Sequence, residues 1–497
     1  MTSARPDGPT ADPGEQVACE MFVAGEWTPA ATGETFAASS PGTGAVIGSV
    51  AQGDRADARR AIEAARGAAD GWARLTAFER AAKIHAVGDL IEARRDELAR
   101  TLTLDQGKPL HAEAYDEVAE LVEYWRMAAE DAKRLGGELP NSISAGKRVM
   151  LVRRPRGAVG VISPWNWPYT MPAELLAPAL AAGNTVVWTP APSTAVCAQA
   201  LARCIVDADL PPGVFNLATG PGPVVGDEIA RNRGLAGIAF IGSTATGNLV
   251  AAAAAGKAAL LEMGGNGPLV VMDDANIAAA VEATLVACYL CAGQSCTAGE
   301  RILVQRGAHD EYVELLGRAV SERVRLGDPF APETTMGPLN NEPVAAKMDE
   351  HVADALERGA TLVCGGARAG DLGSDLYWQP TVLDGVPSDA RVATEETFGP
   401  IAPVVSIDSL EQAIELTNAS PYGLLSAIFT ADLAAGLRFA EAVRTGWVNI
   451  NESTNYWEAH LPFGGRAGTG SGIGRVGGAH VMHTFTELQT VVVSESP

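Results

Sequence analysis

A cysteine, a glutamate and an asparagine have the residue types and neighbours needed for covalent chemistry on a carbonyl carbon. Cys296 ends the run Gly293–Cys296, so small neighbours leave its thiol open to an electrophile. Glu262 comes just before a Gly-Gly pair, a turn that can direct the carboxylate toward a water molecule. Asn166 offers an amide donor for an oxyanion. The three side chains therefore suggest a nucleophile, a candidate base and an oxyanion donor.

Each of the three also has an ordinary structural interpretation. Glu262 could cap a helix or form an ion pair, and Cys296 could be a buried, inert thiol. Asn166 could satisfy a turn between Trp165 and Trp167. The occurrence of all three in one chain, together with glycine-rich turns of the phosphate-binding type, favours an enzyme.

Two glycine-rich turns could contact a diphosphate. The turn Gly242–Gly247 follows a strand-like run and opens a helix, whose free N–H groups would face the phosphates with Ser243 as an extra donor. The turn Gly220–Gly226, which contains Gly222, also follows a strand-like run. Neither matches the G-x-G-x-x-G fingerprint, so each is also consistent with an ordinary turn between a strand and a helix.

Length and charge restrict the class of protein. A chain of 497 residues predicts two or three domains. A net charge of −23 argues against a nucleic-acid partner, because there is no surplus of Lys and Arg to neutralise phosphates. The same charge disfavours anionic membranes, and no apolar stretch reaches the roughly 18 residues that a membrane span needs.

The cysteines indicate a reducing compartment. Seven cysteines form an odd, sparse set, which predicts free thiols in a cytoplasmic protein rather than a disulfide framework. Cys288 and Cys291 have C-x-x-C spacing, but no second ligand pair accompanies them, so no metal site is expected. Residues 1–16 are rich in Pro, Gly and Asp without an apolar core, which predicts a disordered tail and not a signal peptide.

The elements that must position these residues alternate between strands and helices. Residues 54–133 have a helical period, which is interrupted at Asp105–Pro109, and residues 137–155 indicate an extended excursion. Short apolar runs then predict buried parallel strands at Ala158–Ile162, Thr185–Trp188, Val214–Leu217, Gly237–Ile241 and Ala258–Leu261, with helices at Thr194–Asp207, Val224–Arg231 and Thr246–Ala255. This pattern is typical of a doubly wound α/β domain.

A second alternation follows. We expect strands at Leu269–Met272, Arg301–Val304, Val404–Ile407, Leu425–Phe429 and Trp447–Ile450, with helices at Ile277–Tyr289, His309–Arg323 and Pro343–Arg358. The tail Thr484–Val493 is also β-like. A strand that follows a complete second domain is often an interface element, and we expect it to be one here.

Six motifs in order resemble the aldehyde dehydrogenase superfamily, from about Met21 to the C-terminus. They are Pro164–Pro168, Phe240–Thr244, Leu261–Gly265, Gly293–Cys296, Glu395–Pro400 and Pro462–Gly465. The resemblance implies an α/β fold with a Rossmann-type dinucleotide-binding domain (17–136 and 156–261), an α/β catalytic domain (262–480) and a small β oligomerisation element (137–155 and 481–497). It also implies a homodimer or homotetramer.

The resemblance implies a role for each motif residue. Cys296 would attack an aldehyde to give a thiohemiacetal, Asn166 would hold the oxyanion, and hydride transfer to the nicotinamide would leave a thioester. Glu262 would activate the water that hydrolyses the thioester, whereas relatives that transfer the acyl group to coenzyme A usually lack this carboxylate. Of the cofactor-binding residues, Trp165 and Ser243 would lie at the diphosphate, Glu396 on the nicotinamide ribose, and Phe398 against the nicotinamide. Gly242 and Gly222, from the two glycine-rich turns, are further cofactor-binding candidates.

Two departures from the family pattern bear on the cofactor and on proton transfer. Thr189 begins Thr-Pro-Ala-Pro where the family usually has Lys-Pro-x-Glu, which removes both adenosine-side groups. The cofactor is therefore NAD or NADP, with NAD favoured. Leu175 stands where many relatives carry a lysine that is thought to help proton transfer, so we expect the relay from Glu262 to run through water.

The aldehyde itself is the least constrained feature. Trp167, Tyr289, Tyr456 and Trp457 could line an apolar funnel for an aromatic or medium-chain aldehyde, or could be core residues. The alternatives are Arg466 or His460 meeting an anionic semialdehyde tail, a cofactor-free thiol hydrolase or acyltransferase that pairs Cys296 with His460, and a non-catalytic binding protein.

Overall fold

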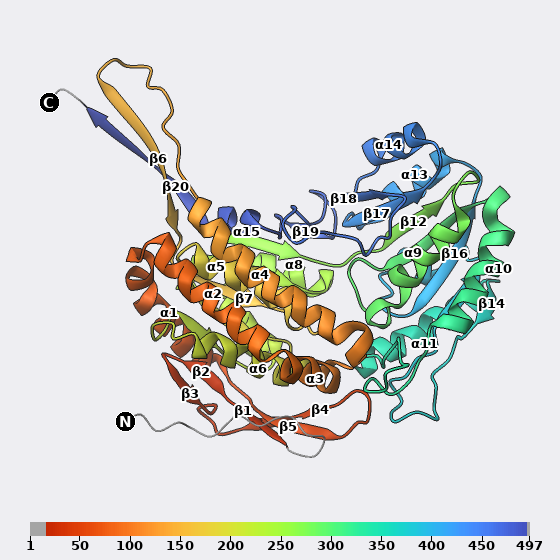
Figure 1. Ribbon diagram of the computed structural model, residues 1–497, viewed down its shortest axis with the longest axis horizontal. Helices are drawn as coiled ribbons and strands as arrows, with labels where there is room; N and C mark the ends of the chain where they lie inside the picture. The colour runs from red at the N-terminus through yellow and green to blue at the C-terminus, as the bar shows by residue number, and fades with distance from the viewer. Residues whose placement is uncertain (1–15, 495–497) are drawn as a thin grey trace.

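The computed structural model describes residues 16–494, so nearly all of the predicted disordered tail at residues 1–16 lies outside the described residues. Two lobes, each built on its own sheet, stand side by side, and a thin two-stranded arm projects from one of them (Figure 1). This mixed α/β architecture with parallel sheets confirms the predicted fold class. No helix in the described part of the chain is both long and apolar enough to cross a bilayer.

The first lobe contains an eight-stranded sheet whose central strands are parallel. In spatial order the strands are β19 (Gly472–Ile473), β11 (Ala258–Glu262), β10 (Gly237–Ile241), β7 (Ala158–Ile162), β8 (Thr185–Thr189), β9 (Phe215–Leu217), β2 (Met21–Val23) and β3 (Glu26–Thr28). The central strands β10, β7 and β8 are buried on both faces, which is why their sequences are continuous apolar runs. At one edge, β19 returns from the end of the chain and pairs Gly472 with Glu262.

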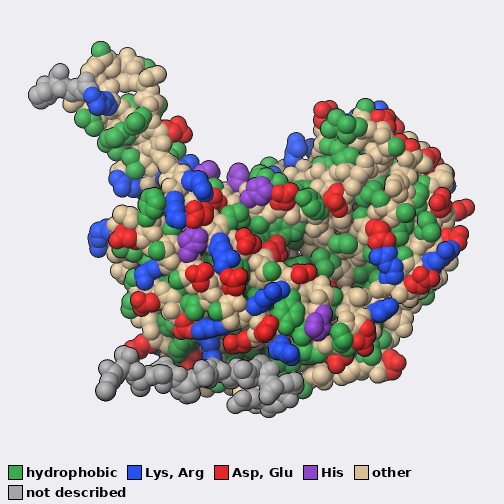
Figure 2. Space-filling model, viewed as in Figure 1, with side chains coloured by type: hydrophobic (Ala, Val, Ile, Leu, Met, Phe, Trp, Pro, Cys, Tyr) green, Lys and Arg blue, Asp and Glu red, His purple; other side chains and the backbone are tan. Residues whose placement is uncertain are grey.

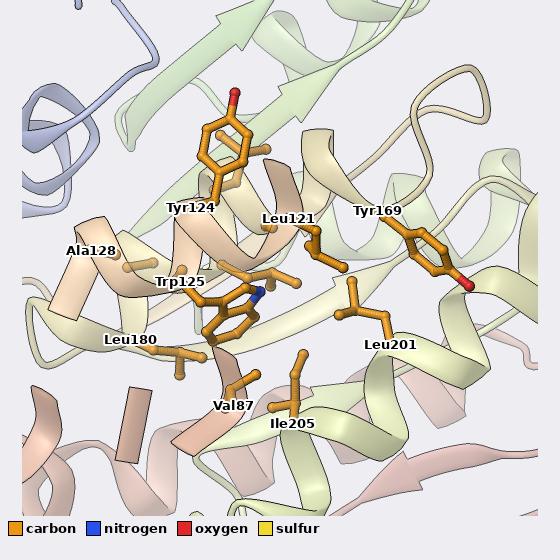
Figure 3. Close-up of a cluster of buried hydrophobic side chains, with 14 of the residues drawn as sticks. Val87, Leu121, Tyr124, Trp125, Ala128, Tyr169, Leu180, Leu201 and Ile205 are labelled. Carbon is orange, nitrogen blue, oxygen red and sulfur yellow. The ribbon is translucent and has the colours of Figure 1, made fainter. Parts of the chain in front are cut away.

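Helices cover both faces of this sheet. One face packs against α1 (Arg55–Arg74), α7 (Asp227–Arg231) and α8 (Thr244–Ala253), and the other against α5 (Thr170–Ala181) and α6 (Ala195–Asp207), with α2 (Ala77–Ala93), α3 (Arg95–Gln106) and α4 (Tyr115–Arg134) outside them. Figure 3 shows the apolar side chains between these helices, with Val87 and Leu180 near the Trp125 ring. Trp125 is fully buried, so it fixes α4 against α2 and α5.

Local sequence signals explain where several helices begin and end. Asp54 and Thr76 form capping boxes at the starts of α1 and α2, because each side chain accepts the N3 backbone N–H and the N3 carboxylate accepts the cap N–H. Gly107 ends α3 at φ +100, and an added Cβ there would lie 3.0 Å from Pro338 Cγ. A π turn, Leu110–Ala114, then leads into α4.

The second lobe contains a seven-stranded sheet. In spatial order the strands are β14 (Thr361–Cys364), β15 (Thr381–Asp384), β16 (Ile401–Ile407), β13 (Gly299–Gln305), β12 (Gly267–Val271), β17 (Leu425–Phe429) and β18 (Trp447–Ile450), and all except β14 run parallel. Its helices are α9 (Ile277–Tyr289), α10 (Arg306–Arg323), α11 (Glu342–Glu357), α12 (Arg391–Thr394), α13 (Leu410–Ala419) and α14 (Leu433–Ala442).

Two small sheets complete the molecule. The strands β1 (Val17–Cys19), β5 (Val46–Ala51) and β4 (Thr35–Ser39) form one of them beneath α6. The arm consists of β6 (Lys147–Pro155) and β20 (Thr486–Ser494), which pair antiparallel along their whole length after the short helix α15 (Ala479–Thr484). Hydrophobic side chains lie exposed along the arm (Figure 2), including Leu488 and Val492.

Several observed elements were not predicted from the sequence. The five strands before residue 52 are three to six residues long, too short for a clear period. The helix α5 was also missed. Every residue in it is buried, so it shows no amphipathic stripe, and Pro172 and Pro178 interrupt a segment that otherwise consists largely of the helix formers Ala, Leu, Met and Glu. The strands β14, β15 and β19 are two to four residues long and were likewise not expected.

Candidate active site

Cys296 lies in a tight turn between α9 and β13. The backbone is left-handed at three consecutive residues, with φ of 54° at Cys291, 51° at Ala292 and 70° at Gly293. An added Cβ at Gly293 would lie 2.2 Å from the Gly399 carbonyl oxygen, so only glycine allows this close approach. The turn ends α9 abruptly and carries Cys296 to the space between the lobes.

Glu262 ends β11 and leads into the Gly-Gly turn that packs against the Cys296 backbone. An added Cβ at Gly265 would lie 2.3 Å from the Cys296 carbonyl oxygen, and one at Gly264 would lie 2.7 Å from both carboxylate oxygens of Glu396. The glycine pair therefore permits a close contact between the end of β11 and the turn that holds Cys296.

Asn166 is buried beside the same turn. Its Nδ2 donates a hydrogen bond to the Gln294 carbonyl oxygen at 2.9 Å, which leaves the second amide hydrogen available. Its own carbonyl oxygen accepts a contact of 3.4 Å from the Cys291 thiol, whose sulfur is in turn 3.5 Å from Gln106 Nε2. One contact thus holds the Asn166 side chain and the other holds its backbone.

Two cavities meet at Cys296 and Glu262, and both residues line both cavities. The Ser243 cavity spans about 860 Å³, including space open to solvent, and is lined by Pro164, Trp165, Asn166, Met171, Ile241, Gly242, Ser243, Glu262, Gly264, Cys296, Asn341, Pro343, Val344, Lys347, Glu396 and Phe398. The Trp457 cavity spans about 500 Å³, again including open space, and is lined by Glu120, Trp167, Met171, Glu174, Glu262, Leu290, Ser295, Cys296, Thr297, Asn455, Trp457, Phe463 and Val476.

The Ser243 cavity has the groups that a dinucleotide needs. Ser243 is the N-cap of α8, so the free N–H groups of this helix begin at the cavity wall. The Glu396 carboxylate accepts the Gly265 N–H at 2.8 Å. The Trp165 and Phe398 rings meet edge to face with centroids 5.5 Å apart, and Phe398 has a left-handed φ of 58°. A helix N-terminus, an acceptor carboxylate and an aromatic wall fit a dinucleotide cofactor.

Two residues predicted to bind the cofactor lie outside the Ser243 cavity. Thr189 ends β8 with 2% of its surface exposed, and its Oγ1 has no hydrogen-bond partner. Gly222 is exposed at the start of the π turn Gly222–Gly226. Both lie at the carboxyl ends of strands in the first sheet, where doubly wound folds bind ligands.

The predicted aromatic funnel needs correction. Trp167 and Trp457 line the Trp457 cavity, but Tyr289 and Tyr456 do not. The Tyr289 hydroxyl donates to the Thr381 carbonyl oxygen at 2.9 Å inside the second core, because the left-handed turn after α9 leads away from it. The Tyr456 side chain is about half exposed, and its hydroxyl donates to Glu458 Oε1 at 2.8 Å.

The two basic residues that were alternative candidates to bind an anionic substrate tail also lie outside the Trp457 cavity. Neither Arg466 nor His460 lines the Trp457 cavity. The His460 side chain is 59% exposed, and its Nδ1 lies 3.5 Å from a Glu458 carboxylate oxygen. Leu175, at the position where many relatives have lysine, is fully buried in the first core and does not reach either cavity.

The titratable groups at the junction are strongly perturbed. Burial raises the pKa of Glu262 well above its usual range, and the nearby carboxylates of Glu174 and Glu396 raise it further. Burial likewise raises the pKa of the Cys296 thiol, with Glu262 as the next contributor. Glu262 Oε1 has no hydrogen-bond partner. A buried, unpartnered carboxyl beside a thiol is poised to exchange a proton with a bound molecule.

Sequence reasoning missed three charged residues of the two cavities. Glu120 on α4 and Glu174 on α5 both face the Trp457 cavity. Lys347 on α11 lines the Ser243 cavity and donates to the Glu396 carbonyl oxygen at 3.2 Å. None of them belongs to a motif, and only the packing of α4, α5 and α11 brings them to the site.

A doubly wound sheet beside a second α/β lobe, with a thiol where the two lobes meet, defines a two-lobed α/β dehydrogenase. The sequence model of the aldehyde dehydrogenase family matches residues 27–491. The chain belongs to this family, whose members are oxidoreductases that act on aldehydes with NAD or NADP.

Relatives and solved structures agree over almost the whole chain. Glutarate-semialdehyde dehydrogenase of Pseudomonas aeruginosa is 39% identical over 472 residues, which cover 95% of this chain and 96% of the relative. The NADP-dependent succinate-semialdehyde dehydrogenase of Escherichia coli is 38% identical over 476 residues, 95% of this chain and 97% of the relative. The crystal structure of an NAD-dependent aldehyde dehydrogenase from Sinorhizobium meliloti has a TM-score of 0.94 and 34% identity, covering 98% of this chain and 97% of that chain. Betaine aldehyde dehydrogenase from Staphylococcus aureus in complex with NAD+ has a TM-score of 0.93 and 33% identity, covering 96% and 95%.

Proposed function

We propose that this protein oxidises an aldehyde to the carboxylic acid through a covalent intermediate on Cys296, with NAD or NADP as the electron acceptor. The observation that carries this proposal is the meeting of two cavities at Cys296 and Glu262. A thiol reached from one side by an aldehyde and from the other by a dinucleotide has the arrangement that this oxidation requires.

The proposed chemistry assigns one role to each residue. The Cys296 thiolate adds to the aldehyde carbon, and the free amide hydrogen of Asn166 stabilises the alkoxide. When bound, the oxidised nicotinamide supplies the hydride acceptor that no side chain provides. Loss of hydride from the former aldehyde carbon leaves a thioester on Cys296. Glu262 then takes a proton from water, which attacks the thioester and releases the acid and the thiol.

Because the pKa of Cys296 is raised, its thiol must be deprotonated before it can attack the aldehyde. Burial and the neighbouring carboxylates favour the protonated thiol, which is a poor nucleophile. The thiol must therefore lose its proton to a base at the site. Glu262 is the second-largest contributor to this shift and is the base available beside the sulfur. The same carboxylate would thus serve both the attack and the hydrolysis.

The choice between NAD and NADP depends on the adenosine end, which we assign to Thr189 and Gly222. A neutral Thr189 offers neither a carboxylate for a ribose hydroxyl nor a cation for a phosphate at that position. The relatives differ too, since one is named for NADP and another was solved with NAD+. We retain NAD as the favoured cofactor, with Trp165, Gly242, Ser243, Glu396 and Phe398 assigned to the nicotinamide and diphosphate part of the site.

The Trp457 cavity supports an aldehyde of medium length with an apolar middle. Trp167, Trp457 and Phe463 provide an aromatic wall. An anionic tail, as in the semialdehydes for which two of the relatives are named, is disfavoured, because no Arg, Lys or His is among the residues that line this cavity. Since other relatives are named for betaine aldehyde, family membership leaves the charge of the tail open.

We further propose that the protein is a homodimer or homotetramer assembled through the arm. Residues 137–155 and 481–497 would form the oligomerisation element, beside a dinucleotide-binding domain (17–136 and 156–261) and a catalytic domain (262–480). Exposed Leu488, Val492 and Val493 on β20 support this role, because an isolated two-stranded arm with apolar side chains gains stability by packing against another surface.

A cofactor-free thiol hydrolase is the rival class. It would pair Cys296 with His460, and the exposed position of His460 outside both cavities counts against it. The test is a panel of aldehydes assayed with NAD and NADP in parallel, with Cys296→Ala as the matched variant. We expect reduced nicotinamide and acid in equal amounts from the wild type, and no turnover but intact nucleotide binding in Cys296→Ala. Activity near the wild-type level in this variant would refute the proposal.

A further inference from the structure

The charged side chains that line the Trp457 cavity are all acidic. They are Glu120, Glu174 and Glu262, and the lining residues include no Arg, Lys or His to balance them. Glu262 has a role in the proposed chemistry, but the other two carboxylates do not. Glu120 and Glu174 line the Trp457 cavity, where the aldehyde tail would lie. The reaction at Cys296 does not explain why they are there.

Glu174 is buried without a partner. Its side chain projects from α5, only 3% of the residue is exposed, and Oε1 makes no hydrogen bond. Burial raises the pKa of Glu174 well above its usual range, and Glu120 raises it further. An isolated buried carboxylate is costly unless a complementary group pairs with it. A group that enters the cavity with the substrate can provide this pairing.

We infer that the Trp457 cavity selects aldehydes that carry an ammonium group, primary or quaternary, at the end remote from the carbonyl. The inference rests on the proposed function, because the aldehyde carbon must lie at Cys296 while the cation lies beside Glu174 and Glu120. A positive charge there would pair with Glu174, whose Oε1 has no hydrogen-bond partner, and with Glu120, which lines the same cavity. It would also lower the pKa of each carboxyl and restore its charged form.

The aromatic wall of the cavity suits the same group. Trp167, Trp457 and Phe463 line it, and aromatic faces attract cations. The Trp167 ring already has a cation against it, since Lys108 Nζ lies 3.1 Å from the ring centroid. Lys108 does not line the cavity and is paired with Glu117 at 2.5 Å, so its charge only partly offsets that of Glu120.

Other occupants of this acidic cavity fit less well. Within residues 16–494 no group of three or more carboxylate, imidazole or thiol side chains is arranged to hold a metal ion, so an inorganic cation lacks a ligand set. A carboxylate tail would face like charges on two sides of the cavity. An uncharged tail would leave the buried Glu174 unpaired.

The test compares substrates that differ only in charge. Trimethylammonio-acetaldehyde is assayed against its uncharged isostere, in which a tert-butyl group replaces trimethylammonio, and the comparison is repeated with the corresponding four-carbon aldehydes. Succinic semialdehyde provides the anionic arm. We expect kcat/KM for the cationic member of at least one pair to exceed that for its isostere by about 100-fold, as expected for a desolvated charge pair.

Variants then locate the effect. Glu174→Gln keeps the shape of the side chain and removes its charge, so it should lower the ratio of kcat/KM for the cation to kcat/KM for the uncharged isostere by about 100-fold. The ratio is the readout because Glu174 also acts on the pKa of Glu262, and a change there affects both substrates alike. Glu120→Gln should act in the same direction with a smaller effect, because Glu120 is less buried. Glu123→Gln is the matched control, since its side chain is on the same helix, 70% exposed and outside the cavity. It should change neither substrate.

The outcomes separate this inference from the proposed function. Equal kcat/KM within both pairs, a preference for succinic semialdehyde, or an equal loss for both substrates in Glu174→Gln would overturn the cation selectivity while leaving aldehyde oxidation intact. An equal loss would assign Glu174 to proton transfer or to the fold. Failure to oxidise any aldehyde in the panel with either nucleotide would overturn the proposed function and the selectivity with it.

Discussion

A single added methyl group at Gly265 should disable the enzyme without unfolding it. In Gly265→Ala the new Cβ would lie 2.3 Å from the Cys296 carbonyl oxygen, roughly 1 Å closer than non-bonded heavy atoms approach. Leu424 Cδ2, at 3.4 Å, blocks retreat of the methyl group in another direction. The backbone of Cys296 or of the Gly-Gly turn must therefore move by about 1 Å, and a displacement of that size costs about 100-fold in rate at a reacting centre.

The assay is the steady-state rate of reduced nicotinamide formation, with nucleotide binding measured separately by quenching of tryptophan fluorescence. We expect kcat to fall about 100-fold and the nucleotide Kd to change less than threefold, because Gly265 does not line the Ser243 cavity. Gly71→Ala is the matched control, since an added Cβ on this exposed face of α1 meets no atom within 4 Å. It should leave kcat unchanged.

The result that would refute this reasoning is a folded Gly265→Ala protein with kcat within threefold of the wild type. It would mean that the glycine pair does not set the distance between the end of β11 and Cys296. Loss of nucleotide binding together with kcat would also contradict it, because the damage would then extend beyond the turn.

Three further changes test other parts of the structure. Glu262→Gln should slow both the attack and the hydrolysis, and the hydrolysis more, so the acyl-enzyme that still forms on Cys296 should persist and be visible as a mass adduct. The wild-type rate of hydrolysis should rise with pH above the usual glutamate range, because a base must be unprotonated and burial raises the pKa of Glu262; a flat pH profile would contradict this. Lys108→Met should lower the free energy of unfolding by about 3–5 kcal/mol, since it leaves the fully buried Glu117 carboxylate unpaired, whereas Lys108→Met/Glu117→Gln should recover at least half of the loss in urea titrations. Thr189→Lys should tighten NADP binding about tenfold by supplying a cation near the adenosine, and an unchanged Kd would place the adenosine elsewhere.

The sequence predicted the elements whose pattern is local. The helix α9 and the strands β17 and β18 have the predicted bounds. Apolar periodicity and capping residues such as Asn276 act within a few residues, so they can be recognised without the fold. The helix α5 could not be recognised in this way, because burial on all sides removes the polar face that gives a helix its period.

The residues of the candidate site also fall into those with a local sequence signal and those placed only by tertiary packing. Cys296, Glu262 and Asn166 are in motifs, and the structure brings all three to the junction of the two cavities. Glu174 and Glu120 are brought together only by the packing of α4 on α5, a tertiary contact without a sequence signature. Tyr289 was wrongly predicted to line the substrate cavity because it is close to Cys296 in sequence. The left-handed turn between them, which separates the two side chains, has no recognisable sequence signal.

The strand β19, near the end of the chain, pairs with β11, the strand that carries Glu262. Gly472 lies so close to β11 that an added Cβ would be 2.0 Å from the Leu261 carbonyl oxygen, and it pairs with Glu262 itself. The edge of the first sheet that carries Glu262 is therefore completed only after the whole second lobe has been synthesised. The second sheet does not depend on this strand, since its own strands all lie between Gly267 and Ile450. A fragment that ends before Gly472 would therefore leave β11, the strand of Glu262, as an open edge of the first sheet.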